Sequence, residues 1–305
     1  MVTPDPARAR RLTFHSGSLT CAADLYLPPE AGSPSPCVVM AHGFSGTKDG
    51  LRHQASRFAS AGFAVLAFDY RYFGESEGMP RQLIATRQQV QDYHAAVRFV
   101  ASIPEVDAQL IALWGTSLSG GHVLTVAAGN PAVAAVISQV PWVGIDFRAK
   151  DPRGTGVTLR LFGAAILDLL ASAIGAPPLL LPVIGLPGEL AAFNDPEATR
   201  AVEAMSTGGA WVNAFTARTL FDLMRYRPAR YTSDVAAPLL VCVADQDAYA
   251  PPRLTIETAR SAPRGELRRY PIRHFDAYLE AADSILDDQI AFLNAHLRPS
   301  VGAAT

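Results

Sequence analysis

The stretch LIALWGTSLSGGHV, residues 110–123, places a serine between an apolar run and a run rich in glycine. Residues 109–115 have the pattern of a short buried strand, and a helix is expected to begin near Leu118. Ser117 would then stand at a sharp turn from strand to helix, a position that presents a serine hydroxyl as a nucleophile. The alternative is a turn of small residues that carries no chemistry.

The turn departs at one position from the pattern G-x-S-x-G. Gly115 stands two residues before Ser117, but Ser119 takes the place of the second glycine. Both positions must be small, because the backbones of the strand and the helix approach closely there. Serine is small enough for this place, so we interpret Ser117 as the candidate nucleophile.

Apolar strands alternate with helices on both sides of this turn. Further strands are expected over residues 19–28, 37–44, 63–71, 133–141, 238–244 and 265–271, and helices over 49–62, 86–102 and 277–296. This alternation predicts an α/β fold with a mostly parallel sheet covered by helices on both faces. Ligands of such sheets bind at the carboxyl ends of the strands.

Residues 142–232 interrupt the alternation. They contain helical patterns and a proline-rich loop, and no strand run is recognisable among them. We expect a helical insertion that lies as a lid over the carboxyl ends of the strands. The chain is thereby divided into a first core segment, residues 1–141, the lid, residues 142–232, and a second core segment, residues 233–305.

Two later segments supply partners for the serine. A nucleophile at such a turn requires an acid and then a histidine, in that order along the chain. Asp245 and Asp247 both follow the strand 238–244, and their positions alone leave the choice between them open. His274 lies in a loop before the last helix. We expect His274 to accept the serine proton and one of the aspartates to orient it.

Two backbone N–H groups are expected to stabilise the negative charge that develops on the substrate oxygen. One belongs to Leu118, at a helix N-terminus where the helix dipole favours an anion. The other is expected from Phe44, after the turn at Gly43. We interpret His42 and His122 as structural residues rather than additional bases.

Together these motifs resemble the serine α/β-hydrolases over about residues 12–297. The resemblance rests on His42-Gly43-Phe44, DYRYFGESEG (69–78), GTSLSGG (115–121), ADQDAYAP (244–251) and His274. In that family the acid stands four positions before a proline, which favours Asp247 over Asp245. Residues 114–123 and HFDAY (274–278) are also similar to a branch that includes bacterial α/β-hydrolases and fungal polyketide transferases.

The resemblance implies a two-step acyl transfer that begins with attack by Ser117 on a carbonyl carbon and ends with release of the acid by water. We expect a carboxylic ester or thioester with a hydrophobic acyl or aryl group. Acyl transfer to another acceptor, in the manner of a polyketide transferase, and a non-catalytic ligand-binding relative are the alternatives. Dehalogenases and epoxide hydrolases require an aspartate at the position of Ser117 and are excluded.

The proposed lid supports a hydrophobic substrate. Residues 158–186 are rich in Leu, Ile, Val and Phe, and Arg160 and Asp168 are the charged residues among them. Part of this apolar surface must pack against the core, and the rest should form one wall of the substrate pocket. An unpaired ionic group would be costly to bury there. We therefore expect medium-sized acyl or aryl esters to be preferred over acetyl esters and charged peptides.

Composition narrows the partners further. The chain has 305 residues, of which 49% are hydrophobic and 18% charged, and a formal net charge of −2. It has no basic run for nucleic acid or a membrane surface. The proline-rich segment 176–187 is too short to cross a bilayer. We expect a small-molecule substrate, no nucleic acid and no membrane insertion, while a homodimer stays open.

Three cysteines, Cys21, Cys37 and Cys242, form an odd set without close pairing, which argues against a disulfide framework. Residues 1–11 lack the apolar segment of a signal peptide. We therefore expect a cytoplasmic protein. The chemistry needs no organic cofactor, and no group of His, Cys and Asp has metal-ligand spacing, so neither a cofactor nor a metal is expected.

Overall fold

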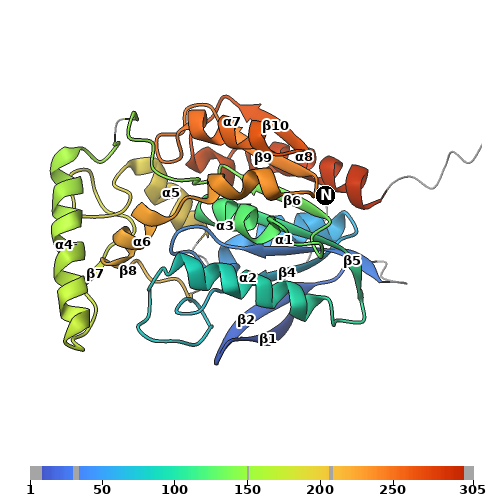
Figure 1. Cartoon of the computed structure of the whole chain (residues 1–305), viewed down its shortest axis with the longest axis horizontal. Helices are drawn as coiled ribbons and strands as arrows, with labels where there is room; N and C mark the ends of the chain where they lie inside the picture. Colours follow the sequence, from blue (N-terminus) through green and yellow to red (C-terminus); the bar gives the residue numbers. More distant parts are fainter. Residues whose placement is uncertain (1–8, 30–33, 150, 206–208, 299–305) are drawn as a thin grey trace, which may run out of the picture.

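One eight-stranded sheet crosses the computed structural model, which describes residues 9–29, 34–149, 151–205 and 209–298 (Figure 1). The strands lie in the order β1-β2-β4-β3-β5-β6-β9-β10. Their bounds are β1 Arg10–Ser16, β2 Leu19–Tyr26, β3 Ser35–Ala41, β4 Ala64–Phe68, β5 Val106–Thr116, β6 Ala135–Gln139, β9 Leu239–Ala244 and β10 Gly265–Tyr270. The pairs β1–β2 and β2–β4 are antiparallel, and the neighbours from β4 to β10 are parallel. The predicted fold class is confirmed.

Helices cover both faces of the sheet, as the apolar strands require. α1 (Arg52–Ser60) and α8 (Ala282–Leu297) lie on one face, and α2 (Thr86–Val100), α3 (Leu118–Ala127) and α7 (Pro252–Ser261) lie on the other. Successive residues of a strand point to opposite faces. Trp114 of β5 accordingly packs in the core cluster of the first pair, and its neighbour Leu113 packs in that of the second set.

The structure differs from the sequence prediction in two places in the core. The sequence does not predict β1, because its first residues, Arg10 and Arg11, are charged and exposed and only two of its inward positions, Leu12 and Phe14, are apolar. The helix expected over 277–296 begins instead at Ala282, after a separate 3-10 helix over Phe275–Tyr278. That extra turn places the residues after His274 against the site described below.

Residues 142–232, the expected lid and called the lid segment below, contain three α-helices in their described part: α4 (Thr155–Ala173), α5 (Pro196–Met205) and α6 (Thr219–Arg225). Two strands of two residues each, β7 (Leu180–Leu181) and β8 (Phe215–Thr216), pair antiparallel within it. We predicted no strand here, and a two-residue strand is too short to show a sequence pattern. Phe44, from the loop after β3, packs into the apolar cluster of this segment. The lid segment therefore contacts the carboxyl end of the sheet.

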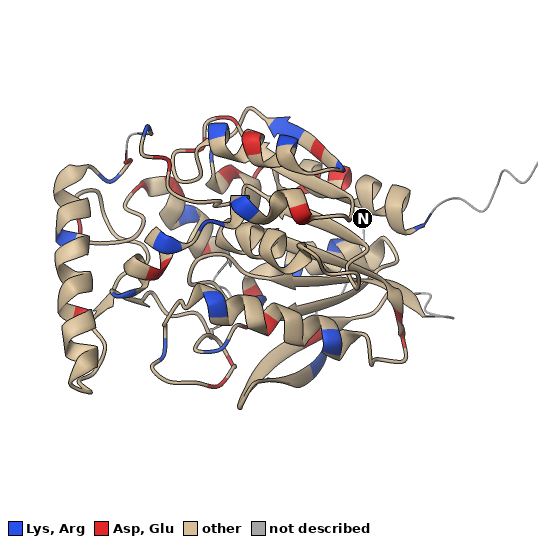
Figure 2. Ribbon diagram, viewed as in Figure 1, with Lys and Arg blue, Asp and Glu red and all other residues tan. Residues whose placement is uncertain are grey.

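α4 forms the outermost layer on one side of the molecule (Figure 1). Its inner face is fixed by the buried Asp168, whose carboxylate accepts the N–H groups of Leu179 and Arg218, both at 2.8 Å. Its outer face is apolar, with Leu159 66% and Leu170 61% exposed, and shows little charge in Figure 2. In the described part of the chain, α4 is the one helix whose length and composition would fit a membrane span.

Candidate active site

Ser117 lies at the turn between β5 and α3 with a backbone φ of 54° and ψ of −119°. A positive φ is unfavourable for a residue with a side chain and must be held by its surroundings. The carbonyl oxygen of Gln139 accepts the Ser117 N–H at 2.9 Å, and the Ser117 carbonyl accepts the N–H of Trp142 at 2.9 Å. A Cβ on Gly115 would lie 2.2 Å from the carbonyl oxygen of Ser119. Glycine is therefore required at 115.

Ser119, the departure from the family pattern, is fully buried and has a structural role. Its hydroxyl donates a hydrogen bond of 2.9 Å to the carbonyl oxygen of Ala41 and lies 3.0 Å from the hydroxyl of Tyr93. These contacts join the start of α3 to β3 and α2. The side chain that replaces glycine thus links α3 to the neighbouring helix and to a strand beneath it.

The structure brings Ser117, His274 and Asp247 together. His274 Nε2 lies 3.1 Å from Ser117 Oγ, and His274 Nδ1 lies 2.6 Å from Asp247 Oδ2. Because an ionised carboxylate only accepts, Nδ1 carries the proton and Nε2 is free to accept the serine hydroxyl. His274 and Asp247 are buried, which limits competition from water.

Of the two candidate aspartates, only Asp247 faces the histidine. Its second oxygen, Oδ1, accepts the backbone N–H groups of Tyr249 at 2.8 Å and Ala250 at 2.6 Å, so the carboxylate is fixed at both ends. Asp245 instead forms an ion pair of 2.8 Å with Arg269 on β10.

The N–H groups expected to bind the substrate oxygen belong to segments that flank Ser117. Leu118 is the first residue of α3, where backbone N–H groups have no partner within the helix. The loop after β3 passes close to the serine, since a Cβ on Gly43 would lie 3.2 Å from Ser117 Cβ. Phe44 follows in the same loop, and its side chain lines the space in front of Ser117.

We call the hydrogen-bonded set of Ser117, His274 and Asp247 the relay. His42 and His122 are not part of it. His42 Nδ1 is 2.9 Å from the Gly43 carbonyl oxygen, and burial lowers the pKa of His42 to about 4. His122 contacts the Tyr226 hydroxyl at 2.8 Å and Gln89 Oε1 at 3.0 Å, and burial lowers its pKa to about 3. Both imidazoles are therefore neutral at neutral pH; His122 is enclosed in the core, and His42 lines the smaller cavity described next.

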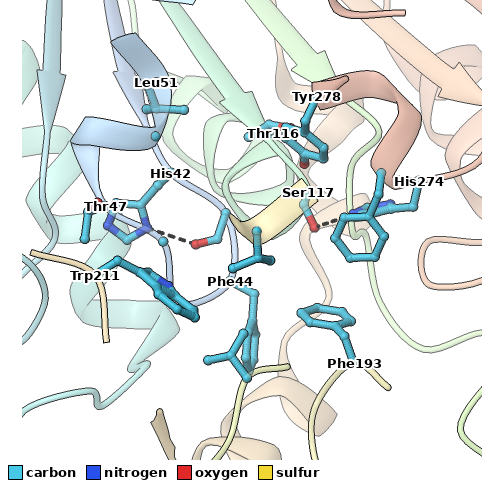
Figure 3. A pocket seen from close by; sticks show the side chains of 16 residues that line it. His42, Phe44, Thr47, Leu51, Thr116, Ser117, Phe193, Trp211, His274 and Tyr278 are labelled. Carbon is cyan, nitrogen blue, oxygen red and sulfur yellow. Dashed lines mark hydrogen bonds between the residues drawn. The ribbon is translucent and has the colours of Figure 1, made fainter. Parts of the chain in front are cut away.

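Two apolar cavities meet at Ser117 and His274. The smaller, about 70 Å³, extends past Thr47, Leu51 and Trp211 (Figure 3). The larger, about 160 Å³, extends between α4 and α6. Phe44 and Phe193 line both cavities, and their rings pack edge to face with centroids 5.6 Å apart.

Only part of the apolar surface of residues 158–186 lines the cavities, as expected. Leu161 and Phe162 line the larger cavity and Val183 lines the smaller. Four others point into solvent on the outer face of α4: Ile166, Leu167, Leu169 and Leu170. Phe193 and Trp211 also line these cavities, although the sequence gives no sign of it. Each is a single aromatic residue in a stretch without a helix or strand pattern, so no local signal shows that the chain brings it next to Ser117.

α5 is joined to the loops that hold Asp247 and His274. Asp195 accepts the N–H groups of Glu197 and Ala198 at the start of α5, both at 3.0 Å, and also accepts the hydroxyl of Tyr249. On the other side, Arg273 forms an ion pair with Glu197. The lid segment therefore contacts Tyr249, two residues after Asp247, and Arg273, directly before His274.

The sheet, its turn at Ser117 and the helices on both faces define an α/β-hydrolase. The family model described as Serine aminopeptidase, S33 matches residues 32–275, and the chain belongs to this α/β-hydrolase family. Its relatives include the quorum-quenching protein AidA of Acinetobacter baumannii, 40% identical over 283 residues, which are 92% of each chain. The polyketide transferase ATR5 of Stachybotrys chlorohalonatus is 31% identical over 228 residues, 73% of this chain and 75% of its own.

A solved structure supports the fold. The α/β-hydrolase GrgF from a Penicillium species superposes with a TM-score of 0.77 over 95% of this chain and 98% of its own. The sequences are 24% identical in that superposition. The similarity therefore establishes the architecture, and the substrate has to be argued from the site.

Proposed function

We propose that this protein hydrolyses carboxylic esters or thioesters with a hydrophobic acyl or aryl group through an acyl-enzyme on Ser117. The observation that carries the proposal is the connected set of Ser117, His274 and Asp247 at the junction of two apolar cavities. This arrangement supplies a nucleophile, a base and an orienting carboxylate beside cavities with mostly apolar walls.

In the first step, the Ser117 hydroxyl proton passes to His274 Nε2 while Oγ bonds to the carbonyl carbon. The N–H groups of Phe44 and Leu118 stabilise the oxyanion. The imidazolium, stabilised by Asp247, then protonates the leaving alcohol or thiol as its bond to carbon breaks. A water molecule attacks the acyl-enzyme by the same sequence, and the acid leaves as Ser117 regains its proton.

The cavity walls support the preference for a hydrophobic substrate. Among the described residues that line the two cavities, Arg153 is the one Lys, Arg, Asp or Glu. Its charge is already paired with Asp151 at 2.9 Å. An ionic substrate would lack a counter-charge, whereas each buried methylene contributes about 0.8 kcal/mol, roughly a fourfold change in rate or affinity. We assign the acyl or aryl group to the larger cavity.

The test combines covalent trapping with a substrate series. A fluorophosphonate should add one group to the wild-type protein and none to Ser117→Ala, as measured by intact mass. Activity on p-nitrophenyl esters from acetate to dodecanoate should peak at medium chain length and exceed activity on aminoacyl amides. A peak at acetate, or faster cleavage of the amides, would contradict the hydrophobic-ester proposal.

The similarity to a quorum-quenching protein extends the panel to signalling compounds that contain an ester, lactone or thioester. These bonds are the ones that this relay can attack. Hydrolysis of one such compound, with loss of that activity in Ser117→Ala, would place the substrate in this class.

Acyl transfer to an acceptor other than water is the second candidate. The presence of two cavities at one serine favours it, because an acyl group could occupy one while an alcohol or amine occupies the other. The similarity to a polyketide transferase points the same way. Product analysis with an ester and a competing hydrophobic alcohol decides between the two, since a transferase would form mainly the new ester.

A further inference from the structure

The Tyr278 side chain lies beside the nucleophile but has no place in the relay described above. Tyr278 is four residues after His274, at the end of the 3-10 helix over Phe275–Tyr278. Its hydroxyl is 2.6 Å from Thr116 Oγ1, on the residue before Ser117. Tyr278, Thr116, Ser117 and His274 line the same cavity, and Figure 3 shows Tyr278 and Thr116 next to each other beside Ser117.

A buried row of polar side chains leads to Thr116 along the face of the sheet that α8 covers, the face against which Tyr278 also packs. Trp114 Nε1 donates to Gln289 Oε1 at 2.8 Å, and Gln289 Nε2 donates to Gln139 Oε1 at 2.7 Å. Gln139 Nε2 then donates to Thr116 Oγ1 at 3.3 Å. Trp114, Gln289, Gln139 and Thr116 are all buried, so water does not substitute for these partners.

The chemistry of the side chains fixes the direction of this row. An indole N–H can only donate, so Gln289 must present its oxygen to Trp114 and its amide nitrogen to Gln139. Gln139 must in turn present its nitrogen to Thr116. At the other end, the Ser117 proton is directed to His274 Nε2, so Ser117 Oγ can only accept from a further neighbour.

We propose that Tyr278 is a further catalytic residue, whose hydroxyl donates a hydrogen bond to Ser117 Oγ while accepting one from Thr116. The chain of donors then runs in one direction from Trp114 through Gln289, Gln139, Thr116, Tyr278, Ser117 and His274 to Asp247. Hydrogen bonds arranged head to tail polarise one another, which strengthens each of them. This inference rests on the proposed function, because it assigns a role at the same serine.

The bond from Tyr278 acts on the oxygen that gains and loses a carbon substituent. When Ser117 gives its proton to His274, the donor from Tyr278 stabilises the negative charge that develops on Oγ. When water displaces the acyl group, the same donor stabilises Oγ as it leaves and is reprotonated by His274. Tyr278 keeps its own proton throughout, so the bonds and protons exchanged in the hydrolysis are the same as in the steps given above.

Burial and the nearby negative charge of Asp247 raise the pKa of Tyr278 above the ordinary value, while side-chain hydrogen bonding with Thr116 and Ser117 opposes the rise. The phenol therefore remains a donor over the whole range in which esterases are assayed.

The decisive variant is Tyr278→Phe, which removes the hydroxyl and keeps the ring. We expect its rate of labelling by a fluorophosphonate, and kcat on the best ester, to fall roughly ten- to hundredfold with KM within about twofold, because one donor to a charged transition state is lost. Tyr72→Phe is the matched control. It removes a hydroxyl that donates to Gln88 at 2.9 Å, outside both cavities, and should label at the wild-type rate.

Variants of Thr116 test the direction of the row. Thr116→Val removes the donor to Tyr278 and should lower the labelling rate by less than Tyr278→Phe does. Thr116→Ser keeps a hydroxyl at this position and should be labelled at the wild-type rate. In the double variant, Thr116→Val should add nothing to Tyr278→Phe, because the two changes interrupt the same chain. Unfolding temperatures of every variant separate these effects from a loss of fold.

The outcomes distinguish the two proposals. If the wild-type protein is labelled at Ser117 and Tyr278→Phe is labelled at the same rate, the role of Tyr278 is overturned while the proposed function stands. If the wild-type protein is not labelled, the proposed function fails first. Additive losses in the double variant would also overturn the continuous chain.

Discussion

Asp245 and Asp247 are two residues apart in the sequence, yet their carboxylates bind different partners. Asp247 Oδ2 contacts His274 and its Oδ1 is held by two backbone N–H groups, whereas Asp245 pairs with Arg269 at the edge of the sheet. An exchange of carboxylate for amide at each position should therefore have unequal effects.

Asp247→Asn should lower kcat by roughly 10³ to 10⁴, because an amide facing Nδ1 favours the wrong histidine tautomer. Asp245→Asn should change kcat by less than about threefold, since a surface ion pair contributes little. Steady-state kinetics on one ester checks both variants. Equal losses in the two would exclude Asp247 as the specific partner of His274.

Ser119 allows a second comparison at the residue scale. Replacement by glycine would restore the family pattern, but it also removes the buried bonds to Ala41 and Tyr93. We expect Ser119→Gly to lower the free energy of unfolding by about 1–3 kcal/mol, from the lost hydrogen bonds and the flexibility of glycine in a helix. Urea unfolding measures the change. An unchanged or higher stability would mean that the serine is merely tolerated.

At the scale of elements, α6 and α4 form the walls of the larger cavity. Met224 of α6 lines this cavity, whereas Leu167 of α4 faces solvent and lines neither cavity. A larger side chain at Met224 should shorten the acyl chain that fits in the cavity. A larger side chain at Leu167 should not.

Met224→Trp should therefore lower kcat/KM for decanoate at least about tenfold relative to butyrate, the equivalent of roughly two buried methylenes. Leu167→Trp is the matched control and should leave the chain-length profile unchanged. The p-nitrophenyl ester series measures both. A uniform loss across all chain lengths in Met224→Trp would show that the larger cavity does not hold the acyl group.

The sheet could be predicted from sequence because its strands are short apolar runs bounded by turns, as in residues 238–244. The residues brought together at Ser117 could also be proposed, since each one follows a strand at the same edge. The positions of Phe193, Trp211 and Tyr278 could not, because they depend on where irregular segments fold back. The segment HFDAY indicates no role for Tyr278, because the row of hydrogen bonds that reaches it joins residues far apart in sequence, Trp114 and Gln289.

At the scale of the whole molecule, two buried histidines apart from His274 stay neutral in the folded protein. The pKa of His42 is lowered to about 4 and that of His122 to about 3, against 6.5 for an unperturbed histidine. Between these values the unfolded chain binds protons that the folded chain does not. The part of the unfolding free energy that depends on these two neutral histidines is therefore fully present above pH 6.5. It is lost as the pH falls from 6.5 toward their pKa values in the folded protein.

His122→Gln should reduce this acid sensitivity. Below about pH 6, the slope of the unfolding free energy against pH should decrease by about 1.4 kcal/mol per pH unit, the value for one proton. Urea unfolding at pH 7, 6, 5 and 4.5 gives the slope, and the variant's own stability at pH 7 serves as its reference. An identical slope in both proteins would mean that His122 is protonated in the folded state.

The exposed apolar face of α4 should determine how strongly the protein adsorbs to apolar surfaces. Leu159 and Leu170 of α4, with Ile174 directly after it, are 66%, 61% and 83% exposed on a chain with a net charge of only −2. Salts that are excluded from apolar surface strengthen its attachment to other apolar surfaces. During purification the protein should bind tightly to a phenyl resin in ammonium sulfate and be released by a mild non-ionic detergent. Leu159→Gln together with Leu170→Gln should elute at higher salt with the same turnover on short esters.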